Sequence, residues 1–188
     1  MTSRSLLTRL ALIGALFLVA APASAKQVST KGFKSKVSVG GKSLVLNGVG
    51  MREATVFKVD VYRGGLYLPS KSSDASAILS KDEPWMIEMK FVRDVDKDKL
   101  VDAWKDGFKN NGKGKGGSGL KKLNSYMSDI EEGDTMTFAY APGKGTKVKV
   151  KGKSKGTIAG KDFGWAMLAV WLGDKPPNKG LKNGMLGK

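Results

Sequence analysis

The stretch VFKVDVYRGGLYL, from Val56 to Leu68, decides the fold, because β-branched, aromatic and aliphatic residues dominate it. Pro69 closes this stretch, since proline cannot continue a β-ladder. The earlier stretch Ser43–Gly48 (SLVLNG) has the same character, and Met51–Thr55 is the expected turn between the two. The pattern predicts a hairpin or a long, bent pair of strands.

Strand and helix patterns alternate along the rest of the chain. A helix is expected from Asp96 or Asp98 to Asn111, because Leu100, Trp104 and Phe108 recur at helical spacing. The other expected elements are a short helix Ala75–Leu79 capped by Asp74, strands Trp85–Val92, Thr135–Tyr140, Lys147–Lys151 and Lys155–Ile158, and helices Leu120–Ile130 and Phe163–Leu172. This order predicts an α+β open-faced sandwich, an antiparallel β-sheet covered on one side by helices.

No internal repeat or second domain is visible, so residues 26–188 are expected to form one domain. The lysine- and glycine-rich stretch Gly112–Gly119 (GKGKGGSG) is expected to be a flexible polar loop. It is not a phosphate-binding loop, because it lacks the GK[ST] ending and follows a helix instead of a strand.

Composition excludes several kinds of chemistry. The 188 residues include no cysteine and no histidine, which excludes disulfides, thiol nucleophiles, cysteine- or histidine-ligated metals and imidazole bases. Acidic residues gather between Asp94 and Asp106, but this spacing suits a helix start and its outer face, and the turn glycine of a calcium loop is missing. We therefore expect neither a metal nor a cofactor.

The N-terminus has the pattern of a secretory signal peptide. Arg4 and Arg9 precede an uncharged run, Leu10–Ala21, which ends in Ala23-Ser24-Ala25. The run is about a dozen residues long, whereas a membrane-spanning helix needs roughly 20. Residues 1–25 are expected to be removed after Ala25, which predicts a periplasmic or secreted protein; the alternative is an uncleaved anchor.

The chain is strongly basic, with 33 Lys and Arg against 17 Asp and Glu and a net charge of +16. Such a charge often indicates nucleic acid binding, but export argues against that partner. Most of the cations are lysines, which are poorly suited to bidentate readout of bases or phosphates. The charge is therefore expected to make a well-solvated surface or to attract anionic lipid or polysaccharide outside the cytoplasm.

Several motifs carry a family resemblance. In order, they are Leu46–Arg52 (LNGVGMR), Val61–Leu68 (VYRGGLYL), Gly133-Asp134, Tyr140–Gly143 (YAPG) and Phe163 followed eight residues later by Trp171-Leu172-Gly173. Each motif is weak alone, but together they resemble the chalcone isomerase-like superfamily, specifically its secreted bacterial branch. The resemblance runs from about Gly40 to Gly187.

The resemblance implies a sheet, a covering layer of helices and, between them, a hydrophobic cleft for an apolar ligand. Plant enzymes of the superfamily cyclise chalcones in this cleft, whereas related plant proteins hold a fatty acid there. Both use an arginine in the motif that here ends at Arg52, which implies that Arg52 anchors an anionic group; the alternative is a turn residue that faces water or pairs with Glu53.

This sequence lacks most of the catalytic residue types of the plant enzymes at the matching positions. Tyr62 stands where those enzymes carry a threonine, although a phenol also donates a hydrogen bond. Leu100 and Gly107 fall nearest the positions of a catalytic tyrosine and an asparagine, and neither supplies a proton. Two functions remain: a non-catalytic binder of a fatty acid or similar apolar anion, and an isomerase of the intramolecular lyase type that acts on a phenolic or enone substrate.

Arg93 is a third candidate ligand contact, either a second anion contact or the ion-pair partner of Asp94 or Asp96. The tryptophans Trp85, Trp104, Trp165 and Trp171 are expected to fill core more readily than to line a cleft.

Overall fold

A computed structural model describes residues 28–188 except residue 56. The expected signal peptide, residues 1–25, lies outside the described residues. None of the helices in the described part is long and apolar enough to cross a membrane.

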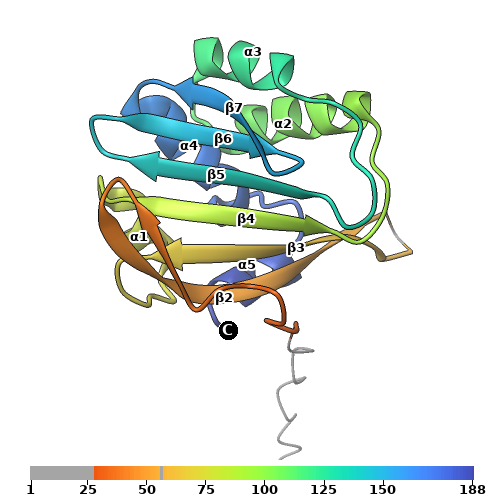
Figure 1. Cartoon of the computed structure of the whole chain (residues 1–188), viewed down its shortest axis with the longest axis horizontal. Coiled ribbons are helices and arrows are strands. Elements are labelled where there is room, and N and C mark those ends of the chain that lie inside the picture. Colours follow the sequence, from red (N-terminus) through yellow and green to blue (C-terminus); the bar gives the residue numbers. More distant parts are fainter. Residues whose placement is uncertain (1–27, 56) are drawn as a thin grey trace, which may run out of the picture.

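The strands form a curled, seven-stranded antiparallel sheet in which each strand pairs with its neighbours in sequence order (Figure 1). Their bounds are β1 Lys36–Val39, β2 Lys42–Ala54, β3 Val59–Leu68, β4 Trp85–Phe91, β5 Thr135–Ala141, β6 Gly145–Val150 and β7 Lys153–Ile158. The predicted long hairpin is β2–β3, but the turn expected at Met51–Thr55 is wrong, because β2 continues to Ala54. Thr55 and Lys58 make the turn instead, with positive φ angles of 62° and 50°.

The helices are α1 Ala75–Ser80, α2 Lys97–Asn111, α3 Gly117–Ser125, α4 Lys161–Leu172 and α5 Lys179–Met185. The Asp74 side chain caps α1, as predicted, by accepting from the backbone N–H groups of Ser76 and Ala77. The structure corrects the predicted loop, because α3 begins inside it at Gly117. Gly119 is buried there against the Phe163 ring, which leaves no space for a side chain at residue 119.

Helix α5, which the sequence pattern did not predict, packs backbone to backbone on β2. A methyl group at Gly50 would overlap the Leu181 carbonyl oxygen, and one at Gly184 would come within 2.6 Å of the Gly50 Cα atom. Leu181 and Met185 are fully buried on α5. The glycines of the motif Leu46–Arg52 therefore allow the C-terminal helix to lie directly on the sheet.

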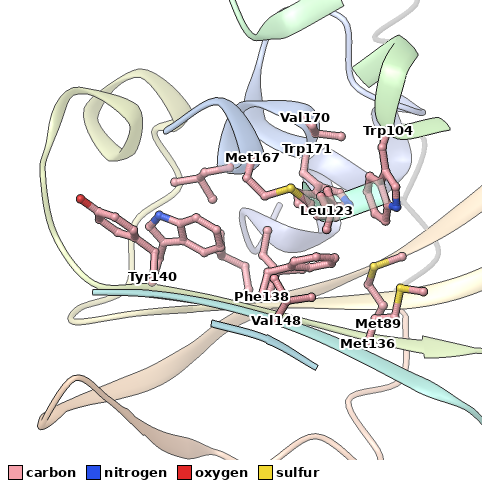
Figure 2. Packing of buried hydrophobic residues seen from close by; sticks show 14 of the residues in the cluster. Met89, Trp104, Leu123, Met136, Phe138, Tyr140, Val148, Met167, Val170 and Trp171 are labelled. Atoms are coloured by element: carbon pink, nitrogen blue, oxygen red, sulfur yellow. The ribbon is translucent and has the colours of Figure 1, made fainter. Parts of the chain in front are cut away.

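All five helices contribute to one core on a single face of the sheet, and the α+β open-faced sandwich is confirmed. On this face the directly paired residues of β4 and its neighbours form four successive rows, Tyr62–Phe91, Met89–Met136, Ile87–Phe138 and Trp85–Tyr140. Figure 2 shows Trp104 and Trp171 lying over Phe138 in the middle of this face. A smaller cluster of Val39, Leu44, Tyr67 and Ala141 covers part of the outer face.

Candidate ligand-binding site

Arg52 of β2 and Tyr62 of β3 are direct partners in the antiparallel ladder. Directly paired residues project to the same face of a sheet, so both side chains lie on the helix-covered face. Tyr62 is buried and Arg52 is half-buried. The structure therefore brings together two of the three predicted ligand contacts at the end of β4 that is marked by Phe91.

The hydroxyl group of Tyr62 accepts a hydrogen bond inside the protein, while its own proton has no acceptor among the described residues. It accepts a hydrogen bond from Trp171 Nε1 at 3.0 Å, and its ring lies 5.5 Å from the Phe91 ring, centroid to centroid. Burial raises the pKa of Tyr62 to about 12, although the Trp171 hydrogen bond and the Arg52 charge both act to lower it. The phenol is therefore protonated at neutral pH, and its own proton has no acceptor among the described residues.

The guanidinium group of Arg52 donates to the backbone oxygen of Glu53 and makes no ion pair with any residue that the structure describes. Asn178, which precedes α5, fixes this part of β2. Its side chain donates to the Met51 oxygen at 3.1 Å and accepts from Glu53 N at 3.3 Å. Because a guanidinium has five N–H donors, most of those of Arg52 remain free to bond a ligand.

Arg93 is exposed in the loop that follows β4. Its predicted ion pair is wrong, since Asp96 pairs with Lys99 at 2.8 Å and Asp94 accepts from the Glu132 backbone N–H at 2.7 Å. Arg93 follows Phe91 by two residues and so belongs to the same end of the sheet as Arg52 and Tyr62. Its role as a second anion contact stays a prediction.

The layer behind Tyr62, where a cleft was expected, is filled by aromatic side chains. The ring centroids of Trp104 and Phe138 lie 5.4 Å apart, and Trp171 lies 5.8 Å from each of them. The prediction that tryptophans fill core is confirmed for Trp85, Trp104 and Trp171, whereas Trp165 is only partly buried. Edge-to-face and tilted packing of these rings replaces the expected open cleft.

Residues 100 and 107 of α2, the two positions compared with catalytic residues of the plant enzymes, carry no polar side chain. Leu100 is buried, and a methyl group at Gly107 would lie 2.8 Å from Val170 Cγ1 of α4. Residue 107 is therefore a glycine because α2 and α4 approach each other closely there, and this contact leaves no space for an amide side chain.

Sequence reasoning missed two residues of the site, Trp171 and Asn178. Trp171 belongs to the motif that ends at Gly173, and its aromatic character indicated core packing but not the hydrogen bond to Tyr62. Asn178 lies more than a hundred residues from Met51 in the sequence. No pattern in the sequence indicated that contact, because it depends on how α5 docks on β2.

Comparison with known proteins places the chain in a family. The model of the family described as chalcone isomerase-like matches residues 25–187. A search of curated proteins finds no match. Among solved structures, a fatty-acid binding protein of Arabidopsis thaliana is similar, with a TM-score of 0.66 and 17% sequence identity over 82% of this chain and 90% of that one. At this identity the likeness shows the fold, and the family match shows that the chain belongs to the chalcone isomerase-like family.

Proposed function

We propose that this protein is a non-catalytic binder of a fatty acid or a similar apolar anion, whose carboxylate is held by Arg52 and Tyr62. The observation that carries the proposal is a local surplus of hydrogen-bond donors. Trp171 donates to the Tyr62 oxygen, so the phenol proton remains free beside the guanidinium of Arg52. The family match and the similar fatty-acid binding protein support this proposal.

A carboxylate suits these donors because it is acceptor-only and has two oxygens. Two parallel N–H groups of Arg52 would bond both oxygens, and the Tyr62 hydroxyl would donate to one of them. The Trp171 hydrogen bond orients the phenol, since it occupies a lone pair on the Tyr62 oxygen.

The apolar tail has to displace side chains, since aromatic rings fill the layer behind Tyr62. Met89 and Met136 form the first row behind Phe91 and are fully buried. Methionine side chains are flexible and adapt to irregular spaces, which makes this row the easiest route for a tail. Each buried methylene contributes roughly 0.8 kcal/mol, so a long chain offsets the cost of moving two side chains.

The alternative function is an isomerase of the intramolecular lyase type on a phenolic or enone substrate. The pairing of Arg52 with Tyr62 is the observation that favours an isomerase, because the same donors would stabilise a developing oxyanion. General base catalysis by Tyr62 is opposed by its raised pKa. Leu100 and Gly107 supply no proton either.

The same proposal places the protein outside the cytoplasm, in the periplasm or secreted. Its support is the sequence pattern of residues 1–25. The lysine-rich composition supports an anionic membrane surface as a second partner.

Titration of the purified protein with palmitate tests the proposal. We expect Arg52→Gln to weaken palmitate binding by roughly tenfold or more, since a charge-assisted hydrogen bond contributes about 1.5–3 kcal/mol. Arg63→Gln is the matched control, because Arg63 lies one residue along β3 on the outer face, where it donates to the Lys31 oxygen at 3.0 Å. Circular dichroism melting of both variants separates binding from folding.

Two results would contradict the proposal. Equal palmitate affinity of Arg52→Gln and the unchanged protein would exclude Arg52 as the anchor. Measurable turnover of a chalcone by a protein that does not bind palmitate would favour the isomerase. Native mass spectrometry of the protein from its export compartment would show whether an acyl ligand copurifies and disappears in Arg52→Gln.

A further inference from the structure

A second candidate site lies at the opposite end of the helix-covered layer, between α1 and α4. The space there is a cavity of about 240 Å³ that opens to solvent. It is lined by the end of α1 and the two residues after it, by Trp85 and Tyr140 at one end of the sheet, and by α4 residues between 161 and 168. Lys115, from the segment between α2 and α3, completes the lining. Arg52, Tyr62 and Arg93 are not among its lining residues.

Fixed aromatic rings form the walls of this cavity. Trp85 and Tyr140 are stacked, with their ring centroids 5.9 Å apart and their planes at 24°. Trp165 of α4 donates from Nε1 to the Leu79 oxygen of α1 at 2.9 Å, which holds its ring in place although it is only partly buried. Ile78, Leu79 and Leu168 complete the apolar part of the lining. These surfaces suit a flat ring, since aromatic groups pack favourably face to face with an offset or edge to face.

The charges at the cavity favour an anion. Its two carboxylates already have partners: Asp82 accepts from the Tyr140 hydroxyl at 2.6 Å, and Asp162 pairs with Lys115 at 3.1 Å. Lys161 makes no ion pair with any residue from 28 to 188, residue 56 apart, and the Lys115 ammonium lies 5.3 Å from the Trp165 ring centroid. Three lysines and two aspartates line the cavity, so its net charge is positive. Lys81 pairs with Glu83 and Lys115 with Asp162, which leaves Lys161 as the lining lysine with no ion-pair partner among the described residues.

The volume limits the size of the ligand. A dry apolar cavity of about 150 Å³ is large enough for benzene, whereas sites for drug-sized molecules span about 300–1,000 Å³. A cavity of about 240 Å³ falls between the two and matches one aromatic ring with a small substituent. We infer that the cavity between α1 and α4 binds a one-ring aromatic carboxylate, with the ring against Trp165 and Trp85 and the carboxylate on Lys161. This inference stands apart from the proposed function, because it uses none of the same residues.

Benzoate is the probe for the test, and the indole N–H signals of the four tryptophans in an NMR spectrum are the readout. We expect benzoate to shift the signals of Trp165 and Trp85 with a dissociation constant of about 1 mM, which is ordinary for so small a ligand. The signals of Trp104 and Trp171 should stay in place, since both rings are buried away from the cavity. Benzylamine, which carries the opposite charge, should bind more weakly than benzoate.

Substitution of Lys161 tests whether its positive charge holds the benzoate carboxylate. Lys161→Gln should weaken benzoate binding by about two- to fivefold, the equivalent of an exposed ion pair. Lys153→Gln on β7 is the matched control, because Lys153 is exposed and does not line the cavity. Trp165→Leu should abolish the saturable shift of Trp85, and a cooperative melting transition of this variant would show that the fold persists.

The inference fails if benzoate leaves the Trp165 signal unchanged at tens of millimolar, or if benzylamine shifts it equally. It also fails if Lys161→Gln and Lys153→Gln bind benzoate with the same affinity as the unchanged protein. Palmitate titration of Lys161→Gln distinguishes the two sites. This variant should bind palmitate as tightly as the unchanged protein, although its benzoate affinity is lowered.

Discussion

The two ends of the layer between sheet and helices differ in what they offer a ligand. At the Phe91 end, Arg52 and Tyr62 present unused donors, but aromatic rings fill the space behind them. At the Trp85 end, a cavity of about 240 Å³ is open, but its carboxylates are already hydrogen-bonded or ion-paired. The buried donor of Tyr62 and the open volume therefore lie at opposite ends of one strand.

The difference follows from how the helices meet the sheet. Over the middle of the sheet, α2 and α4 press together at Gly107 and carry Trp104 and Trp171 onto Phe138. Toward the other end, the short helix α1 contacts α4 through the Trp165 hydrogen bond to Leu79, and the cavity opens beside that contact.

The largest expected effect is that of Gly107→Asn, which tests whether the layer over the middle of the sheet is as full as its contacts indicate. The new side chain would meet Val170 at 2.8 Å and would bury an amide between α2 and α4. We expect the free energy of unfolding to fall by about 3 kcal/mol or more, from overpacking and from the unpaired amide together. Urea unfolding measures the loss.

Gly114→Asn is the control for this substitution. Gly114 has a positive φ of 75° and no atom within 4 Å of an added methyl group, and asparagine tolerates that backbone conformation. Equal stability of the two variants would mean that the contact between α2 and α4 yields easily, which would remove the contrast between the filled and the open end.

The second-largest effect is expected for Met136→Ala, which would create a cavity beside the donors Arg52 and Tyr62, at the Phe91 end of the layer. Met136 is fully buried, so we expect its truncation to lower the free energy of unfolding by about 2–5 kcal/mol. If the acyl tail uses this row, palmitate affinity should rise, because the ligand fills the space that the variant leaves. Calorimetric titration measures this change, and a loss of palmitate affinity would show that the tail takes another route.

Much of the fold was predictable, because regular alternation and helical spacing determined it. Trp85–Phe91 alternates strictly between buried and half-buried residues, and α2 buries Leu100, Trp104 and Phe108 on one stripe. Helix α5 escaped prediction because its sequence, KGLKNGM, contains two glycines and few apolar residues. Its stability comes from contact with β2, and local sequence does not encode such a contact.

The candidate site was predictable only in its residue types. The motif around Gly50 indicated Arg52, and the β-pattern placed Tyr62 on a strand, but their pairing depends on register. Register followed from the position of the turn, which was expected several residues too early. The cavity at Trp165 gave no sequence signal, because it lies between elements that are distant in the chain.

The third effect compares two tyrosines, one at each end of the layer. Tyr62→Phe leaves the fully buried Trp171 Nε1 without an acceptor, which should lower the free energy of unfolding by about 1–3 kcal/mol. Tyr140→Phe removes a hydrogen bond to Asp82, but this exposed carboxylate is free to bond water instead, so the loss should be about 1 kcal/mol or less. Thermal melts of both variants make the comparison, and a larger loss in Tyr140→Phe would contradict it.

The smallest expected effect is that of pH on palmitate binding. Tyr62 donates a hydrogen bond only while it is protonated, and burial raises its pKa to about 12 from the usual 10.0, so the donor persists well above neutral pH. Affinity should therefore stay constant between about pH 7 and 9, and it should fall in acid as the carboxylate becomes protonated near its usual pKa of about 4. Fluorescence titration across this range measures it, and a drop in affinity centred near pH 8 would exclude the protonated phenol as a ligand contact.

The same raised pKa predicts an alkaline loss of stability with a definite sign. Between about pH 10 and pH 12 the unfolded chain has released the Tyr62 proton and the folded protein still holds it. The free energy of unfolding should fall through this window by about 1.4 kcal/mol per pH unit on account of Tyr62. Tyr62→Phe should lack this contribution, so its unfolding free energy should decline less steeply with pH than that of the unchanged protein. Parallel declines of Tyr62→Phe and the unchanged protein would mean that water reaches Tyr62, and the contrast between a closed and an open end would then fail.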